Sequence, residues 1–73
     1  MGEKRTTIIP RAPVARILMK AGAKRVSADA AAAFTDKLEE MASKIAEDAV
    51  RVAKHAGRKT VHESDIKLAA RRS

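Results

Sequence analysis

The chain has 73 residues and a formal net charge of +7 at pH 7, with 16 Lys and Arg against 9 Asp and Glu. A hydrophobic content of 45% is typical of a globular protein, and the length allows one domain at most. The absence of cysteine excludes disulfides, cysteine-ligated zinc and thiol nucleophiles, and it favours a reducing, intracellular setting. No apolar run is long enough to predict a membrane span or a secretory signal.

The excess of positive charge predicts a polyanionic partner, and the missing residue types narrow the choice. Phe34 is the only aromatic residue, and Asn and Gln are absent. Single-strand binders and RNA-recognition sheets stack bases on aromatic rings, and bidentate recognition of adenine uses Asn or Gln. The composition therefore favours duplex binding through phosphates, largely independent of sequence.

Residues 1–8 show no helical period and predict a flexible N-terminal tail ahead of one helical domain over residues 9–73. Pro10 and Pro13 mark the start of a first helix, because proline is tolerated only in the first turn. Gly22 is expected to end this helix after about eleven residues. Its apolar positions recur at helical spacing and are Val14, Ile17, Leu18 and Ala21.

A long second helix is expected over Ala28–Ala56, with Ser27 as its N-cap and Gly57 after its end. At 1.5 Å per residue it would be about 43 Å long. One apolar stripe consists of Phe34, Leu38, Met41, Ile45, Ala49 and Val52, and a second, small-residue face consists of Ala31, Ala42, Ala46 and Ala53. On its outer face we expect ion pairs between Glu40 and Lys44 and between Glu47 and Arg51.

Thr60 and Glu63 have the spacing of a capping box and predict the start of a third helix. Its expected apolar face is Ile66, Ala69 and Ala70, with Val61. Two short helices cannot cover so long a second helix, so we expect a second copy of the chain to cross the first at mid-helix. The long helix has a net charge of −2 and the rest of the chain +9, which places the positive charge in the tail, the first helix, the loops and the C-terminus.

Three segments resemble the archaeal histones: IPRAPVARI at residues 9–17, AGAKRVS at 21–27 and HAGRKTVHESDIKLA at 55–69. The resemblance extends from residue 9 to about residue 72. It implies an all-α histone fold, in which a short, a long and a short helix are joined by two loops and two chains form a handshake homodimer. It also implies wrapping and compaction of double-stranded DNA, with dimers extending into nucleosome-like or filament assemblies on the chromosome, in the cytoplasm.

The resemblance further assigns roles to individual residues. The DNA-binding residues it implies are Arg16, Arg25, Lys59 and Thr60, with Arg16 in the minor groove and with Lys59 and Thr60 of the second loop on phosphate. The positive charge of the first helix and the first loop adds Arg11 and Lys24 to the predicted DNA-binding residues, and Arg11 is a departure from the family pattern. Arg58 and Asp65 resemble a salt bridge that holds the second loop in place. The surface through which dimers join corresponds to Val52, His55, Asp65 and Leu68, and Gly22 matches a position where filament turns stack.

Other functional classes are weaker. His55 and His62 lack the spacing of a metal site, and no catalytic group or phosphate-binding glycine loop is evident, so we expect no metal, no cofactor and no enzyme activity. A basic helix on an anionic membrane is disfavoured because the long helix is net negative. The main alternative is a histone-fold protein that pairs with a different chain in a transcription-related complex, and pairing with histone paralogues stays open.

Overall fold

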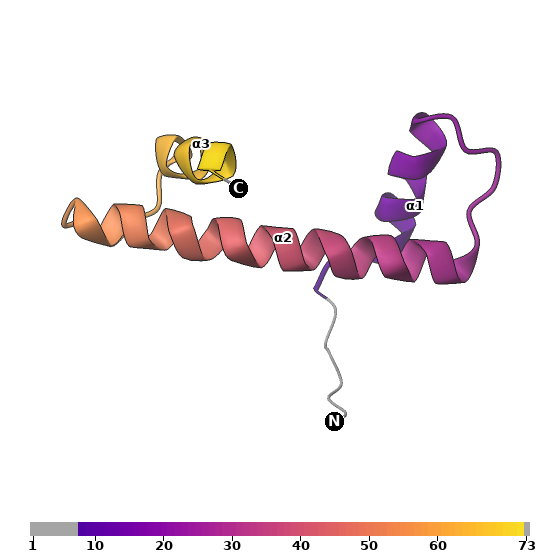
Figure 1. Ribbon diagram of the computed structural model, residues 1–73, viewed down its shortest axis with the longest axis horizontal. Coiled ribbons are helices and arrows are strands. Elements are labelled where there is room, and N and C mark those ends of the chain that lie inside the picture. Colours follow the sequence, from indigo (N-terminus) through magenta and orange to yellow (C-terminus); the bar gives the residue numbers. More distant parts are fainter. Residues whose placement is uncertain (1–7, 73) are drawn as a thin grey trace, which may run out of the picture. The chain divides into compact units, whose positions relative to one another are not determined.

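The computed structural model describes residues 8–72, in which three helices follow one another and no strand occurs (Figure 1). The helices are α1 (Arg11–Lys20), α2 (Ala28–His55) and α3 (Glu63–Arg72). The contacts divide the chain into two units at residues 39 and 40. The first contains α1 and the N-terminal part of α2, and the second contains the rest of α2 and α3. The predicted tail lies almost wholly outside the described residues, and its flexibility stays a prediction.

The backbone at the end of α1 confirms the prediction that Gly22 ends this helix. Gly22 has φ of +120°, and its N–H donates to the Met19 carbonyl at 3.0 Å. The N–H of Ala23 donates to the Leu18 carbonyl at 3.1 Å, which completes a Schellman motif. A Cβ on Gly22 would meet no atom within 4 Å, so the positive φ and not lack of space explains the glycine here.

The second helix begins and ends nearly where the sequence predicts. The hydroxyl of Ser27 accepts a hydrogen bond from the Ala30 N–H at 3.0 Å, as an N-cap does. The helix has 28 residues and ends at His55, one residue before the predicted end. Gly57, with φ of +75°, donates to the Lys54 carbonyl, and Arg58 donates to the Ala53 carbonyl, both at 2.9 Å. Both basic loops therefore begin with the same glycine-containing motif.

The predicted capping box at the start of α3 is wrong. The helix begins at Glu63, three residues after the expected cap at Thr60. His62 precedes the first turn, and its N–H donates to the carboxylate of Asp65 at 2.8 Å. An acidic side chain at the third helical position thus reaches back to the residue before the helix, but it belongs to Asp65 and not to Glu63. Glu63 instead pairs with Lys67 at 2.8 Å, one turn along.

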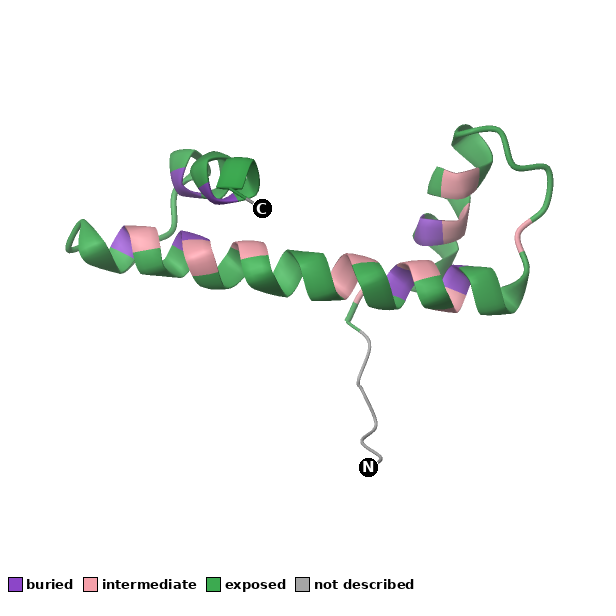
Figure 2. Cartoon of the chain, in the orientation of Figure 1, coloured by how far each residue is buried: buried purple, intermediate pink, exposed green. Residues whose placement is uncertain are grey.

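Little of the apolar surface is buried in the single chain (Figure 2). Of the hydrophobic side chains in residues 8–72, the buried ones are Val14, Ala31, Ala49, Ala53 and Ala69. The large stripe residues of α2 are at best half-buried. The large hydrophobic residues exposed by more than a third are Ile8, Ile17, Met19, Met41, Val50, Val61, Ile66 and Leu68. Such a core is too small to support a globular domain by itself.

Candidate nucleic-acid interface

Four of the predicted DNA-binding residues lie in the first unit. Arg11 and Arg16 lie on α1, and Lys24 and Arg25 lie in the loop that follows its Schellman motif. All four are exposed on the surface. Arg25 also lines an open hollow whose other lining residues are Leu18, Ala23, Val26, Ser27 and Ala30. The first unit therefore presents cations from a helix and from the loop next to it.

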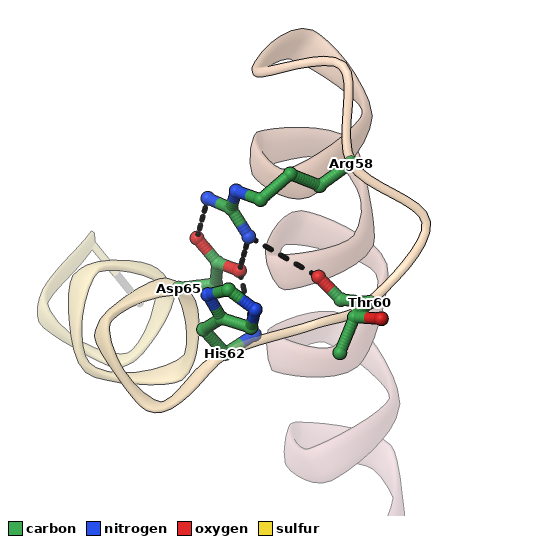
Figure 3. A network of polar contacts seen from close by, with 4 residues as sticks. All are labelled: Arg58, Thr60, His62 and Asp65. Atoms are coloured by element: carbon green, nitrogen blue, oxygen red, sulfur yellow. Dashed lines mark hydrogen bonds and ion pairs between the residues drawn. The ribbon is translucent and has the colours of Figure 1, made fainter.

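Arg58 and Asp65 form the predicted ion pair, and its geometry is bidentate (Figure 3). Arg58 Nη1 donates to Asp65 Oδ2 at 2.9 Å, and Nη2 donates to Oδ1 at 3.0 Å. Nη1 also donates to the Thr60 carbonyl at 3.1 Å. One guanidinium thus joins the middle of the loop to the first turn of α3, and planar forks of this kind hold both distance and orientation.

Asp65 is the acceptor on which this network depends. Its side chain is 3% exposed, while that of Arg58 is 32% exposed. The hydrogen bonds from Arg58 and from the His62 N–H lower the pKa of Asp65 to about 2, against the opposing effect of burial. The same pairing raises the pKa of Arg58 above its ordinary value. The loop is therefore held by a carboxylate that stays ionised throughout the physiological pH range.

Lys59 and Thr60 lie in the loop that this network holds, and both are exposed. The Thr60 carbonyl accepts from Arg58, whereas its hydroxyl takes no part in the network (Figure 3). Thr60 therefore has a structural role through its backbone and keeps its side chain available. The sequence predicted that this hydroxyl caps α3. Because α3 begins only at Glu63, the Thr60 hydroxyl does not have that role.

Some cations of the chain form ion pairs with acidic side chains, whereas the predicted DNA-binding cations form none within the described residues. Arg51 pairs with Asp48 and not with the predicted Glu47, and Lys67 pairs with Glu63. By contrast, within residues 8–72 no hydrogen bond or ion pair is formed by the side chains of Arg11, Arg16, Lys24, Arg25 and Lys59. Unpaired surface cations keep their full capacity to bind phosphate. The other cations that form no such contact in the described part are Lys20, Lys44, Lys54, Arg71 and Arg72, so the lack of pairing agrees with the predicted set without singling it out.

Three of the four residues predicted for contacts between dimers come together in the second unit. Val52, His55 and Leu68 line one groove of about 330 Å³. Its other lining residues are Asp48, Arg51 and Arg72, which the sequence did not assign to it. Asp65 is absent from this lining, because its carboxylate faces Arg58 and the His62 N–H.

Two further residues with clear roles were missed. Thr35 is 1% exposed, and its hydroxyl donates to the Ala31 carbonyl at 2.7 Å inside the small core of the first unit. Glu39 accepts hydrogen bonds from the N–H groups of Ile8 and Ile9. Neither is signalled by local spacing, since a threonine in a helix and a glutamate next to another glutamate are both more often solvent-exposed.

The described residues contain no group of three or more His, Cys, Asp or Glu side chains that could hold a metal ion. Among the helices within residues 8–72, none combines the length and the apolar character that crossing a membrane requires.

Comparison with known proteins places the chain in a family. Residues 7–70 match the profile of the family described as histone-like transcription factor (CBF/NF-Y) and archaeal histone. A protein of Thermococcus zilligii, named as one of the subunits of archaeal histone HAN1, is 49% identical over 63 residues, which are 86% of this chain and 94% of the relative. A protein of Methanocaldococcus jannaschii named probable archaeal histone 3 is 54% identical over 63 residues, with the same coverage. The chain is therefore a histone-fold protein and belongs to the archaeal histone family of DNA-binding chromatin proteins.

Proposed function

We propose that the chain forms a homodimer that bends and wraps double-stranded DNA without reading its sequence, and so compacts the chromosome in the cell interior. The observation that carries this proposal is the set of unpaired surface cations on α1 and on the two loops. In the described residues none of these cations is neutralised by an acidic neighbour. Family membership adds an independent reason.

The distribution of apolar surface supports the dimer. A single chain leaves Ile17, Met41 and Ile66 about half exposed, at 51%, 48% and 43%. Burying such side chains is the main driving force of association, and a twofold partner covers the same residues on both chains. A second copy that crosses at α2 would cover these stripes and complete the core.

Sequence independence follows from the side chains available. The chain has no Asn or Gln for bidentate contacts to adenine and one aromatic residue for stacking. Arg16 and Arg25 suit the role that arginines have in histone octamers, where they enter the minor groove without base-specific contacts. Lys59 and the Thr60 hydroxyl suit phosphate contacts from the second loop. Selectivity would then come from the bendability of the duplex.

Larger assemblies form a further part of the proposal. The groove lined by Val52, His55 and Leu68, together with the charged Asp48, Arg51 and Arg72, offers a surface on which a second dimer can pack. Gly22 is exposed beside the first loop, where the lack of a side chain allows a close approach of another turn of protein and DNA.

We also propose that the chain is not an enzyme and needs no cofactor. The Ser27 hydroxyl caps α2, and the Thr35 hydroxyl is bonded to the backbone. Both hydroxyls are therefore unsuited to nucleophilic catalysis, which needs a free oxygen next to a general base.

The test is a binding titration on two duplexes of equal length and unrelated sequence over a range of salt concentrations. We expect similar Kd values for both and a steep weakening with salt, because each neutralised phosphate releases counterions. Arg16→Ala should weaken binding to both duplexes and lower the salt slope by about 1. Lys67→Ala, which removes a cation already paired with Glu63, should change Kd little. A strong preference for one duplex that persists at about 0.3 M salt would contradict the proposal.

Pairing with a different chain is the second candidate. The family description includes histone-like transcription factors, and the Thermococcus zilligii relative is named as a subunit of an archaeal histone. Sedimentation equilibrium of the purified chain distinguishes the two. A folded species of twice the chain mass of 7.9 kDa supports the homodimer, whereas an unfolded or aggregated chain that folds only with a paralogue supports the heteromer. The finding of a compact monomer that melts cooperatively would exclude both.

A further inference from the structure

One carboxylate on α2 holds the backbone that leads into α1. The N–H groups of Ile8 and Ile9 both donate to Oε2 of Glu39, the second at 2.7 Å. The partners are 30 or 31 residues apart in sequence, and Glu39 and Ile9 are both half-buried. Two N–H groups on one ionised oxygen form charge-assisted hydrogen bonds, which are stronger than bonds between neutral groups.

The start of α1 has no anchor of its own. Its N-cap is Pro10, which is extended, with φ of −66° and ψ of 146°, and makes no side-chain capping bond. The first turn contains no acidic residue, and Pro13 supplies no N–H. Helices are usually fixed at this end by a Ser, Thr, Asp or Asn cap, as α2 is by Ser27. For α1 the tertiary contact with Glu39 takes the place of a local cap.

We infer that Glu39 is a positioning residue for the DNA-binding surface. By holding Ile8 and Ile9 on α2, it sets the place and the direction in which α1 begins, and thereby the positions of Arg11 and Arg16. The effect on DNA binding rests on the proposed function, whereas the placement of α1 rests on the two hydrogen bonds to Glu39. Glu39 acts through α1 and not by contact with DNA.

The sign of the effect separates positioning from simple electrostatics. A carboxylate on a DNA-binding protein repels phosphate, so removing it should strengthen binding if charge alone matters. If Glu39 positions α1, its removal should weaken binding although the protein becomes more positive. Asp36 is a matched control, because it is an exposed carboxylate three residues earlier on the same helix.

The structural part is tested on the free protein by amide hydrogen exchange, followed by NMR. In Glu39→Ala the exchange of the Ile8 and Ile9 N–H groups should accelerate by about tenfold or more, as expected for loss of bonds to a charged acceptor. Glu39→Gln keeps an acceptor oxygen without the charge and should give an intermediate rate, and it also serves if the alanine variant folds poorly. Asp36→Asn should leave both rates unchanged. Equal rates in the wild type and in Glu39→Ala would overturn the inference.

The functional part is tested by titrating the same variants with one duplex at fixed salt. Glu39→Ala should raise Kd by about fivefold, the loss expected from one misplaced arginine contact, and Glu39→Gln should raise it less. Asp36→Asn should bind equally or more tightly. Faster exchange at Ile8 and Ile9 with an unchanged or lower Kd would overturn the positioning role. A wild-type protein that binds no duplex would contradict the proposed function, and the exchange result would still decide whether Glu39 holds this segment.

Discussion

Arg58 and Asp65 face each other across the loop between α2 and α3, with two parallel hydrogen bonds of 2.9 and 3.0 Å between guanidinium and carboxylate. The same carboxylate caps α3 through the His62 N–H, and the same guanidinium holds the Thr60 carbonyl. Two side chains thus determine the course of the loop that presents Lys59 and the Thr60 hydroxyl. Stability and DNA binding should therefore both depend on this pair.

Asp65→Asn should lower the midpoint of thermal unfolding and weaken DNA binding together. The amide cannot accept two bonds from Arg58 and keep the bond from His62, and the half-buried guanidinium loses its counter-charge. Thermal unfolding followed by circular dichroism and a duplex titration measure the two effects. Glu63→Gln is the matched control, because its carboxylate is 80% exposed and pairs only with an exposed lysine, so its effect should be small. Equal effects of the two substitutions would contradict the assigned role.

The dependence of stability on pH should reveal the ionisation of the Asp65 carboxylate. The pKa of Asp65 falls from an ordinary value of 3.8 to about 2 in the folded protein, so the unfolded chain binds this proton more readily than the folded one. The contribution to stability is complete well above the ordinary pKa and is lost as the pH falls through it towards the folded value. Unfolding measured from about pH 2 to about pH 5 should show a difference between wild type and Asp65→Asn that shrinks with acidification. A difference that is constant over this range would contradict the ionised pair.

The two glycines after the helices should differ in their tolerance of alanine. At Gly57 φ is +75°, close to the left-handed region, so Gly57→Ala should cost about 1 kcal/mol in unfolding free energy. At Gly22 φ is +120°, where a residue with a Cβ is more strained, so Gly22→Ala should cost more, up to ~3 kcal/mol. Neither added Cβ meets a neighbour, so the difference isolates the backbone contribution. Denaturant unfolding measures both, and a smaller cost at Gly22 would contradict this explanation.

The groove of the second unit should control assembly beyond the dimer. Leu68 is 40% exposed and lines this groove, so Leu68→Asp should leave the fold intact and place a charge where a second dimer is proposed to pack. We expect dimers in sedimentation and a short, fixed footprint after nuclease digestion, where the wild type gives a ladder. Ser64→Asp adds the same charge in the first turn of α3, away from the groove lining, and should preserve the ladder. A ladder with Leu68→Asp would contradict the proposed contact.

Much of the architecture could be predicted from local signals. Ser27, Gly22 and Gly57 delimit the helices because caps and glycine-containing ends act within one turn. The predicted start of α3 was wrong because Thr60 and Glu63 have the spacing of a capping box, whereas the carboxylate that accepts from the residue before the helix, His62, is that of Asp65. Asp65 also accepts from Arg58, which lies on the other side of the loop, and local spacing does not reveal this contact. Four of the predicted DNA-binding residues could be named from the resemblance, and Arg11 and Lys24 from the distribution of charge; all six lie on the surface.

The amino-acid order alone determined the three helices, the segregation of positive charge outside α2 and the membership of the histone-fold family, because helical periodicity, caps and motifs are properties of neighbouring residues. Only the tertiary structure decided that Asp65 serves both Arg58 and the His62 N–H, and that Glu39 holds the backbone of Ile8 and Ile9. These contacts join residues on different elements. Their partners depend on how helices and loops pack, and a carboxylate bonds to whichever donors that packing brings within reach.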